Sequence, residues 1–243
     1  MTHKLTLSLQ NQVALITGGG RGIGAATAEA LARKGAHVIV ASRTGKELSV
    51  TVNQLRANGY SASSVVLDVA DETAVEAAFA QIAADFGRLD ILVNNAAILL
   101  SGSFADFAVN DWDRLMAVNL RGAMLCAQQA FRLMRTHGGA IVNISSLGGM
   151  PGTEKFPGYA AYTVSKFALT GLTEALAAEG RDRGIRVNGV APGAVDTAML
   201  RQAAPHLRTC TGPVDVAKVI AFLCDPTESG CMTGAMLVIN SNL

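Results

Sequence analysis

Short apolar runs rich in β-branched residues alternate along this chain with longer Ala-rich segments of helical period, and this alternation constrains the fold more than any other feature. Each apolar run is short, and the segment after it repeats its apolar residues every three or four positions. We interpret as strands the runs at residues 13–16, 37–41, 65–67, 91–93, 140–144, 186–190 and 236–239. We interpret as helices the segments at residues 22–34, 45–58, 71–86, 110–136, 160–183 and 213–224.

Strands that alternate with helices form βαβ units, and such units build an open parallel sheet with helices on both faces. The core has to come from Ala, Val, Leu and Ile, because aromatic residues make up only 5% of the chain. The sequence therefore predicts the α/β class, with a single-domain doubly wound Rossmann fold and a seven-stranded parallel sheet flanked by helices on both faces. No Pro/Ser-rich linker or internal repeat divides residues 1–243.

Charge and composition exclude several classes of protein. Lys and Arg number 20 against 19 Asp and Glu, and a net charge of +1 does not suit a nucleic-acid partner or an acidic disordered tail. No apolar signal segment precedes Ser8 and no apolar run reaches about 18 residues, so we expect a cytoplasmic protein with no membrane partner. The cysteines form no CxxC pair and the histidines show no metal-ligand spacing, so we expect no metal site.

The first predicted strand leads directly into the glycine-rich segment Thr17-Gly18-Gly19-Gly20-Arg21-Gly22-Ile23-Gly24. Glycines at such a turn let the backbone approach a pyrophosphate, and the N-terminus of the following helix offers free N–H groups. Between the first strand and first helix of a βαβ unit this pattern indicates a dinucleotide site, the alternative being a generic glycine turn. No Lys-Ser or Lys-Thr pair follows the glycines, which disfavours a Walker-type site.

The second predicted strand ends beside Ser42 and Arg43. In doubly wound folds an acidic side chain at this place hydrogen-bonds the ribose hydroxyls of NAD, and it would repel a 2′-phosphate. The Arg43 guanidinium can instead clamp a 2′-phosphate with paired hydrogen bonds, and Arg21 is a second cation nearby. We therefore expect NADP(H) in preference to NAD(H), the alternative being that both arginines are solvated surface residues.

Tyr162 and Lys166 stand at i and i+4 in the predicted helix 160–183, so both side chains reach one helix face. A free tyrosine has a pKa near 10, and an ammonium one turn away favours the phenolate and lowers that pKa. The pair suits acid–base chemistry, although the same spacing also arises from packing on an Ala-rich helix. Tyr159 is a rival, but Thr163 rather than a lysine follows it by one turn.

Ser146 and Asn119 are two further polar candidates. Ser146 follows the predicted strand 140–144 at the carboxyl edge, where open α/β sheets place their ligands, so its hydroxyl can reach a substrate oxygen. Asn119 lies in an otherwise apolar helical stretch, where an amide is either a satisfied core group or a functional one.

These motifs occur in an order that resembles a known family. The ordered set is Thr17-Gly18-x-x-x-Gly22-x-Gly24, Asp68-Val69, Asn94-Asn95-Ala96-Ala97, Asn119, Ser145-Ser146, Tyr162-x-x-x-Lys166 and Pro192-Gly193. From about Asn11 to Ile239 the chain resembles the short-chain dehydrogenase/reductase family, and most of all its NADPH-dependent branch of 3-oxoacyl-acyl-carrier-protein reductases and carbonyl reductases. The resemblance implies an NADPH-dependent oxidoreductase that transfers a hydride between nicotinamide and a ketone or secondary alcohol. It also implies a cofactor half of about 1–145 and a catalytic and substrate half of about 146–243.

The resemblance assigns catalytic roles to four residues. Tyr162 would be the acid/base, Ser146 would steady the developing alkoxide, and Ser145 would then be a turn residue. Lys166 would act on Tyr162, and Asn119 would bind a water that relays protons to Lys166.

The resemblance also implies the cofactor contacts. The Val195 backbone would meet the nicotinamide carboxamide, Thr197 the carboxamide or a phosphate, and Asn94 would brace the sheet beside them. Asp68 would meet the adenine amino group, or it would cap the helix that starts near Asp71. The cofactor-binding residues that we expect are Gly18, Gly20, Arg21, Gly22, Ile23, Gly24, Ser42, Arg43, Asp68, Val69, Asn95, Ala96, Tyr162, Lys166, Pro192, Gly193, Val195 and Thr197.

Several segments depart from the family pattern. Ala97 stands where a glycine is usual, which suggests a slightly tighter backbone. The loop 148–158 is slightly enlarged, and we expect it to border the substrate pocket unless it is a plain surface loop. The segment 198–211 is shorter than the usual lid, which predicts an open pocket for a bulky, tethered or loosely selected carbonyl compound. The carboxyl end, 240–243, also differs, beside an expected subunit contact.

Charged residues make up only 16% of the chain, below the roughly 25% of an average globular protein. The shortfall falls on two helices, since only Lys166 and Glu174 are charged in residues 160–178 and only Arg121 between Met116 and Phe131. The resemblance implies a homotetramer or homodimer that joins through helices 110–136 and 160–183.

Two other function classes stay open. One is a catalytically silent NADP(H)-binding sensor or scaffold of the same fold, which would normally lack the tyrosine or the lysine. The other is a Rossmann-like methyltransferase, which would need neither the Tyr162–Lys166 pair nor Arg43.

Overall fold

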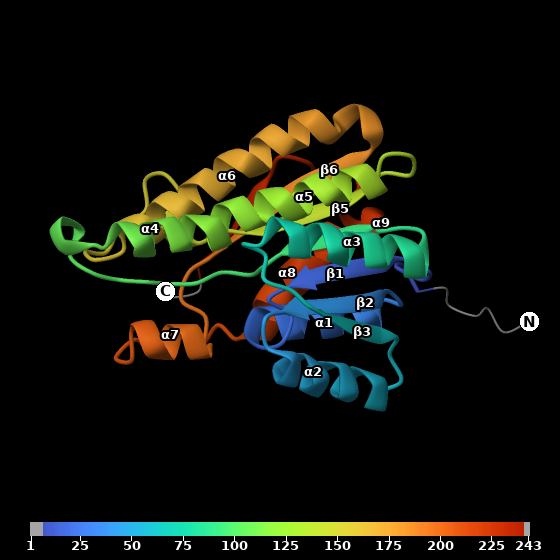
Figure 1. Ribbon diagram of the computed structural model, residues 1–243, viewed down its shortest axis with the longest axis horizontal. Coiled ribbons are helices and arrows are strands. Elements are labelled where there is room, and N and C mark those ends of the chain that lie inside the picture. The colour runs from blue at the N-terminus through green and yellow to red at the C-terminus, as the bar shows by residue number, and fades with distance from the viewer. Residues whose placement is uncertain (1–6, 241–243) are drawn as a thin grey trace, which may run out of the picture.

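The computed structural model describes residues 7–240, and all strands of this range lie in one parallel sheet of order β3-β2-β1-β4-β5-β6-β7 (Figure 1). The strands are β1 (Val13–Thr17), β2 (His37–Ser42), β3 (Ala62–Val66), β4 (Ile91–Asn94), β5 (Gly139–Ile144), β6 (Ile185–Pro192) and β7 (Met236–Ile239). The chain order reverses between β1 and β4, which makes the sheet doubly wound. The predicted fold class is confirmed.

Helices cover both faces of the sheet. The helices are α1 (Gly22–Arg33), α2 (Gly45–Ala57), α3 (Glu72–Phe86), α4 (Val109–Met116), α5 (Gly122–Leu133), α6 (Ala160–Gly180), α7 (Ala198–Ala203), α8 (Pro213–Cys224) and α9 (Pro226–Ser229). Helices α1, α2 and α8 pack on one face, while α3, α5 and α6 pack on the other (Figure 1). Each face has its own apolar core, so the strands β1, β2, β4, β5 and β6 are buried from both sides, whereas the edge strands β3 and β7 are partly exposed.

The central strands show why the apolar runs become strands. Ile16 of β1 pairs with Val40 of β2 and with Val93 of β4, and all three side chains are fully buried. Burial of one such aliphatic side chain is worth about 1.5–3 kcal/mol. These runs therefore form the middle of the sheet, and the residues after each run are delivered to its carboxyl edge.

Three predicted elements need correction. The strand predicted at 65–67 is β3, which runs from Ala62 to Val66 and so begins three residues earlier. The earlier start includes polar residues, because the hydroxyls of Ser61 and Ser63 bond the two ring nitrogens of His37 on the neighbouring strand β2. The helix predicted at 110–136 is divided into α4 and α5 by the π-helical turn η2 (Ala117–Arg121) and ends at Leu133. The helix predicted at 160–183 ends at Gly180 and continues as the 3-10 turn η4 (Arg181–Arg183).

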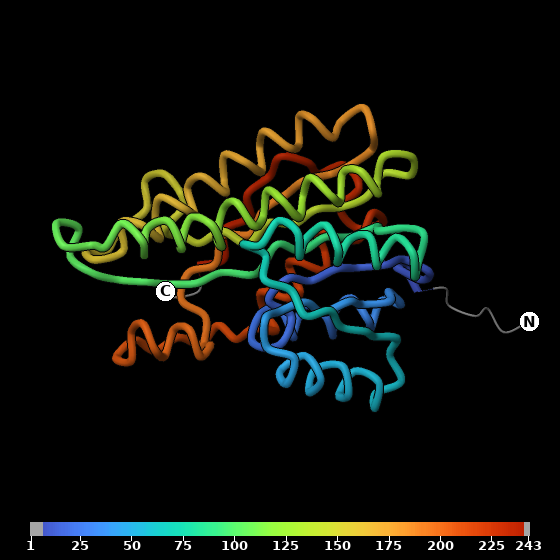
Figure 2. The backbone as a smooth tube through the Cα atoms, in the orientation of Figure 1, coloured from blue at the N-terminus to red at the C-terminus, as the bar shows by residue number. Residues whose placement is uncertain are grey.

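The carboxyl edge of the sheet is extended by segments that come after the strands. The green segment after β4, with η1 (Phe104–Asp106), and the orange helix α7 reach past this edge on the same side of the molecule (Figure 2). The 3-10 turn η3 (Leu147–Gly149) comes after β5. Residues 241–243, with most of the altered carboxyl end, lie outside the described residues.

Candidate active site

The glycine-rich segment makes a tight turn between β1 and α1. Gly18 and Gly22 adopt the left-handed backbone conformation that favours glycine, with φ of +65° and +56°. A Cβ atom at Gly24 would lie far inside contact distance of the Gly18 carbonyl oxygen and 2.7 Å from Asn95 Nδ2. The turn therefore needs glycine at these positions, as the motif predicts.

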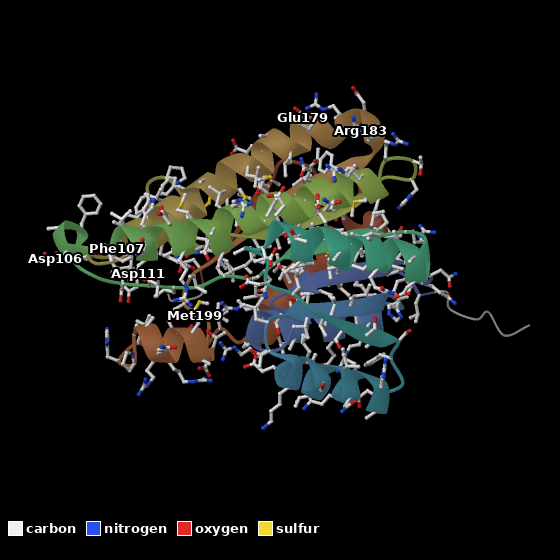
Figure 3. The ribbon with its side chains drawn as sticks, in the orientation of Figure 1. Asp106, Phe107, Asp111, Glu179, Arg183 and Met199 are labelled. Atoms are coloured by element: carbon white, nitrogen blue, oxygen red, sulfur yellow. The ribbon has the colours of Figure 1, made fainter. Side chains whose placement is uncertain are left out.

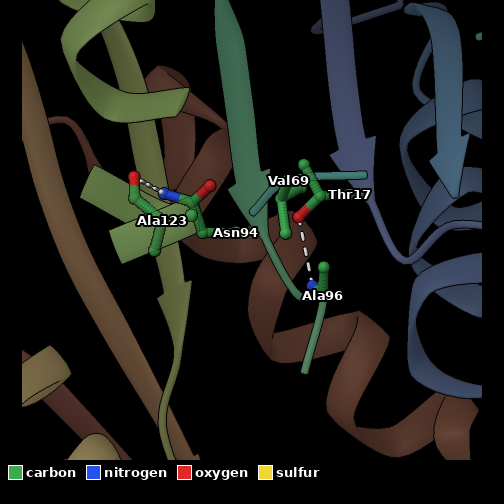
Figure 4. Close-up of a pocket in the computed structure, with 6 residues that line it drawn as sticks. Thr17, Val69, Asn94, Ala96 and Ala123 are labelled. Atoms are coloured by element: carbon green, nitrogen blue, oxygen red, sulfur yellow. Dashed lines mark hydrogen bonds between the residues drawn. The ribbon is translucent and has the colours of Figure 1, made fainter. Parts of the chain in front are cut away.

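The residues after β4 are tied to this turn. Asn95 Nδ2 donates to the carbonyl oxygens of Thr17 and Gly18, at 2.9 and 3.1 Å. Thr17 Oγ1 accepts hydrogen bonds from the backbone N–H groups of Asn95 and Ala96 (Figure 4). The structure thus brings together the glycine segment, Asn95 and Ala96, which are expected cofactor residues far apart in sequence.

Arg21 and Arg43 each face a carboxylate. Arg43 lies 3.9 Å from Asp68, and Arg21 lies 3.6 Å from Glu47 in the first turn of α2. The Glu47 carboxylate was not predicted from the motifs.

Asp68 does not cap helix α3. Asp71 is the N-cap residue and accepts a hydrogen bond from the Ala74 N–H, whereas Asp68 accepts one from the Ala70 N–H and holds a turn. The alternative capping role of Asp68 is therefore wrong.

Tyr162 and Lys166 lie on one face of α6, and the Lys166 ammonium is 5.7 Å from the centre of the Tyr162 ring. Lys166 is only 2% exposed, and its Nζ donates to the Ile144 carbonyl oxygen at 2.7 Å. Burial lowers the pKa of Lys166 to about 8.

The expectation that Lys166 lowers the pKa of Tyr162 is not met. Burial raises the pKa of the Tyr162 phenol, and a hydrogen bond with Ser146 opposes that rise. Desolvation is the larger influence on the Tyr162 phenol, and the Lys166 ammonium donates to the Ile144 carbonyl. Ser146, Tyr162 and Lys166 are nevertheless brought together at the ends of β5 and α6.

The two serines after β5 point to different groups. Ser145 is buried, and its Oγ donates to the Lys166 carbonyl oxygen at 2.9 Å and lies 3.2 Å from Thr170 Oγ1. Ser146 instead accepts from the Gly148 N–H and bonds Tyr162. Ser145 is thus more than a turn residue, because it attaches β5 to the helix that carries Tyr162.

Asn119 lies in the π-helical turn η2 and is fully engaged with protein. Its Oδ1 accepts from the Ile98 N–H at 2.8 Å, and its Nδ2 donates to the Ile98 carbonyl and to Ser165 Oγ. The side chain therefore ties the segment after β4 to α6, as a satisfied core amide does. Its role in a proton relay stays a prediction.

The turn after β6 packs against the glycine segment. Gly193 N–H donates to the Ile239 carbonyl, and Asp196 N–H donates to the Thr211 carbonyl, which closes the segment that contains α7. Thr197 Oγ1 caps α7 by accepting from the Leu200 N–H. A Cβ at Gly22 would meet only the Thr197 methyl group, at 3.7 Å, so the turn at 192–197 faces the first turn of α1.

Comparison with known proteins agrees with this geometry. The sequence model of the family described as "short chain dehydrogenase" matches residues 12–208. The chain belongs to this family. It is therefore an oxidoreductase that acts on a small molecule with a nicotinamide cofactor.

Three relatives illustrate the range of this short-chain dehydrogenase family. The short-chain reductase protein NovJ of Streptomyces niveus is 38% identical over 93% of this chain and 91% of its own. Versicolorin reductase 1 of Aspergillus parasiticus is 36% identical over 90% of this chain and 91% of its own. The structure of a gluconate 5-dehydrogenase from Burkholderia cenocepacia J2315, solved in complex with NADP and tartrate, has a TM-score of 0.88 at 32% identity, covering 99% of this chain and 98% of that one.

Two segments of this short-chain dehydrogenase contact the region around the start of α6. Tyr159, the rival aromatic, donates from its hydroxyl to the Ala203 carbonyl in α7, so it bonds this segment rather than Ser146. The loop 148–158 joins the segment after β4 through the Gly102 N–H, which donates to the Gly158 carbonyl. Figure 3 shows Met199 on α7, and Phe107 and Asp111 around the start of α4.

Sequence reasoning expected Asn94 to brace the sheet but missed Asn143 and Thr173, with which it forms a buried network beneath the site. Asn94 Nδ2 donates to Asn143 Oδ1 and to the Ala123 carbonyl, and Asn143 Nδ2 donates to Thr173 Oγ1 on α6. Figure 4 shows Asn94 in the small cavity that Thr17, Val69 and Ala96 also line. A polar residue at the end of an apolar run could have indicated this network, because Asn143 occupies such a position as Asn94 does.

Two general features concern the described residues only. No helix within residues 7–240 has the length and hydropathy needed to cross a membrane. In the same range no three potential metal-binding side chains converge.

Proposed function

We propose that this protein is an NADP(H)-dependent oxidoreductase that interconverts a ketone and a secondary alcohol, with Tyr162 as the acid/base. The observation that carries the proposal is the joint placement of Ser146, Tyr162 and Lys166 where β5 ends and α6 begins. A silent sensor or scaffold is not favoured, because the complete set of acid–base side chains is assembled.

The described residues fit a dinucleotide. The N-cap of α1, Arg21, makes no side-chain hydrogen bond to the first turn, so the first N–H groups remain free for a pyrophosphate. Gly18, Gly20, Gly22, Ile23 and Gly24 supply this turn, and Val69, Asn95 and Ala96 lie beside it. On the far side, Pro192, Gly193, Val195 and Thr197 would hold the nicotinamide. When bound, the cofactor supplies or accepts the hydride.

The protein's own residues would move the proton. Tyr162 would donate its phenolic proton to the carbonyl oxygen during reduction, and the Ser146 hydroxyl would hydrogen-bond the developing alkoxide. With a pKa of about 8, Lys166 is mainly protonated at pH 7 and can supply a proton toward Tyr162. Asn119 and Ser145 would position α6, which carries both groups.

NADP(H) is proposed over NAD(H) because Ser42 itself carries no charge at the end of β2, Arg43 follows it directly, and Arg21 in the glycine segment is a second cation. The NADP in the related Burkholderia structure supports this choice. Asp68 would meet the adenine ring.

The proposed substrate is a carbonyl compound or alcohol of the kind that carbonyl and 3-oxoacyl reductases use. The short segment 198–211 and the loop 148–158 would border it and leave room for a bulky or tethered group. The relatives support the reaction class, since they include both reductases and a dehydrogenase.

We also propose a cytoplasmic homotetramer or homodimer, joined through helices 110–136 and 160–183. An apolar groove on these helices supports this assembly, and its lining includes Met116, Leu120, Met124 and Leu172. Sedimentation at micromolar concentration should show a dimer or larger species. A stable monomer would contradict the proposal.

A direct test combines binding and turnover. NADPH and NADH are titrated separately against the protein by nicotinamide fluorescence, and ketones, β-keto thioesters and secondary alcohols are then screened at 340 nm. We expect tighter binding of NADPH and turnover of at least one carbonyl class. Binding of neither cofactor would refute the proposed function.

A further inference from the structure

We propose that Glu47 is a specificity-determining residue of the cofactor site, whose carboxylate limits the preference of this protein for a cofactor with a 2′-phosphate. The inference rests on the proposed function, in which Arg21, Ser42 and Arg43 surround that phosphate. The negative charge of Glu47 would weaken the binding of NADP(H) more than it weakens the binding of NAD(H).

The backbone places Glu47 against the glycine segment. A Cβ atom at Gly20 would lie 3.0 Å from Glu47 Cβ and 3.4 Å from Ser42 Oγ, so these three residues share one small space. Thr51 Oγ1, one turn after Glu47 in α2, donates to the Gly20 carbonyl at 3.0 Å. Helix α2 is thereby held against the turn, and the stem of Glu47 remains beside Ser42.

The charges around this space are already paired. Arg21 lies 3.6 Å from the Glu47 carboxylate, and Arg43 lies 3.9 Å from Asp68. A 2′-phosphate would have to compete with Glu47 for Arg21, and it would also bring a second negative group close to the carboxylate. Both effects oppose phosphate binding.

A ribose with free hydroxyls meets a different environment. A hydroxyl can donate a hydrogen bond to a carboxylate, so NAD(H) does not experience the repulsion that NADP(H) does. Glu47 therefore acts on the difference between the two cofactors. The Arg21 side chain is largely exposed and that of Glu47 partly exposed, so water and salt screen the effect to a modest size.

The experiment replaces Glu47 by Gln, which keeps the length of the side chain and removes its charge. Adenosine 2′,5′-bisphosphate and ADP are titrated by calorimetry at low and high salt, and NADPH and NADH by fluorescence. We expect the Kd of both 2′-phosphorylated ligands to fall about three- to tenfold at low salt, with less change for ADP and NADH and a smaller gain at high salt.

Glu29→Gln is the matched control. Glu29 pairs with Arg33 on α1 at 2.6 Å, so this variant loses the same charge from another ion pair. It should leave the ratio of the NADPH and NADH dissociation constants unchanged. Unchanged binding in Glu47→Gln, or an equal change for ligands with and without the 2′-phosphate, would overturn the role of Glu47.

The two proposals fail in different ways. If the unaltered protein binds NADH as tightly as NADPH, the proposed cofactor preference fails. The shift of the ratio between unaltered protein and Glu47→Gln still decides the role of Glu47, because adenosine 2′,5′-bisphosphate reports the phosphate site without the nicotinamide.

Discussion

Replacement of Gly24 by alanine tests whether the turn after β1 is held as tightly as its contacts indicate. The new Cβ would collide with the Gly18 carbonyl oxygen and lie 2.7 Å from Asn95 Nδ2, so the turn or the Asn95 side chain must move. Such overpacking costs about 1–3 kcal/mol. Loss of the Asn95–Gly18 hydrogen bond costs about 1 kcal/mol more, and the better helix propensity of alanine returns roughly that amount.

The net expectation is a destabilisation of about 1–3 kcal/mol. For a chain of this size that corresponds to a fall in Tm of about 2–4 °C per kcal/mol, which scanning fluorimetry resolves. The displaced Gly18 carbonyl also disturbs the first turn of α1, so NADPH affinity measured by fluorescence should fall as well.

Gly45→Ala is the control, because a Cβ there would meet only Val66 Cγ2 at 3.6 Å, an ordinary contact. Its Tm should stay close to that of the unaltered protein. If Gly24→Ala retains both Tm and NADPH affinity, the turn is looser than its contacts indicate and the reasoning is refuted.

Three further predictions concern the catalytic and cofactor groups. Tyr162→Phe should retain NADPH affinity but lose turnover by about 10²-fold or more, whereas Tyr159→Phe should keep turnover; loss of activity only in the second variant would exchange the roles of the two tyrosines. Lys166 has a folded pKa of about 8, below its unfolded value of 10.5, so the unfolded chain binds more protons between these values and stability should rise with pH there. Relative to Lys166→Met, the protein should gain up to about 3 kcal/mol between pH 8 and 10.5, and denaturant unfolding that shows a constant difference would contradict the burial of the ammonium. Arg43→Asp should shift the ratio of dissociation constants toward NADH, and an unmoved ratio would place the phosphate site elsewhere.

Much of the fold was predictable because its signals are local. Apolar runs and helical periods are set by neighbours in sequence, and they place most strands within a residue or two. The errors occur where distant groups intervene. Hydrogen bonds of His37 with Ser61 and Ser63 accompany a third strand that begins earlier than predicted. The amide of Asn119 lies at the π-helical turn that divides the helix predicted at 110–136.

For the site, the sequence by itself determined the residue types and their order along the chain. Each motif comes directly after a strand or opens the next helix, and parallel strands deliver such residues to one edge of the sheet. Ser146, Tyr162 and the glycine segment could therefore be expected to meet. Only the tertiary structure decided the electrostatics. Burial lowers the pKa of Lys166 and raises that of Tyr162, and Glu47 faces Arg21 from another helix. These pKa shifts and this ion pair depend on which distant groups come into contact and on how much water is excluded. The spacing of residues along the chain determines neither of these.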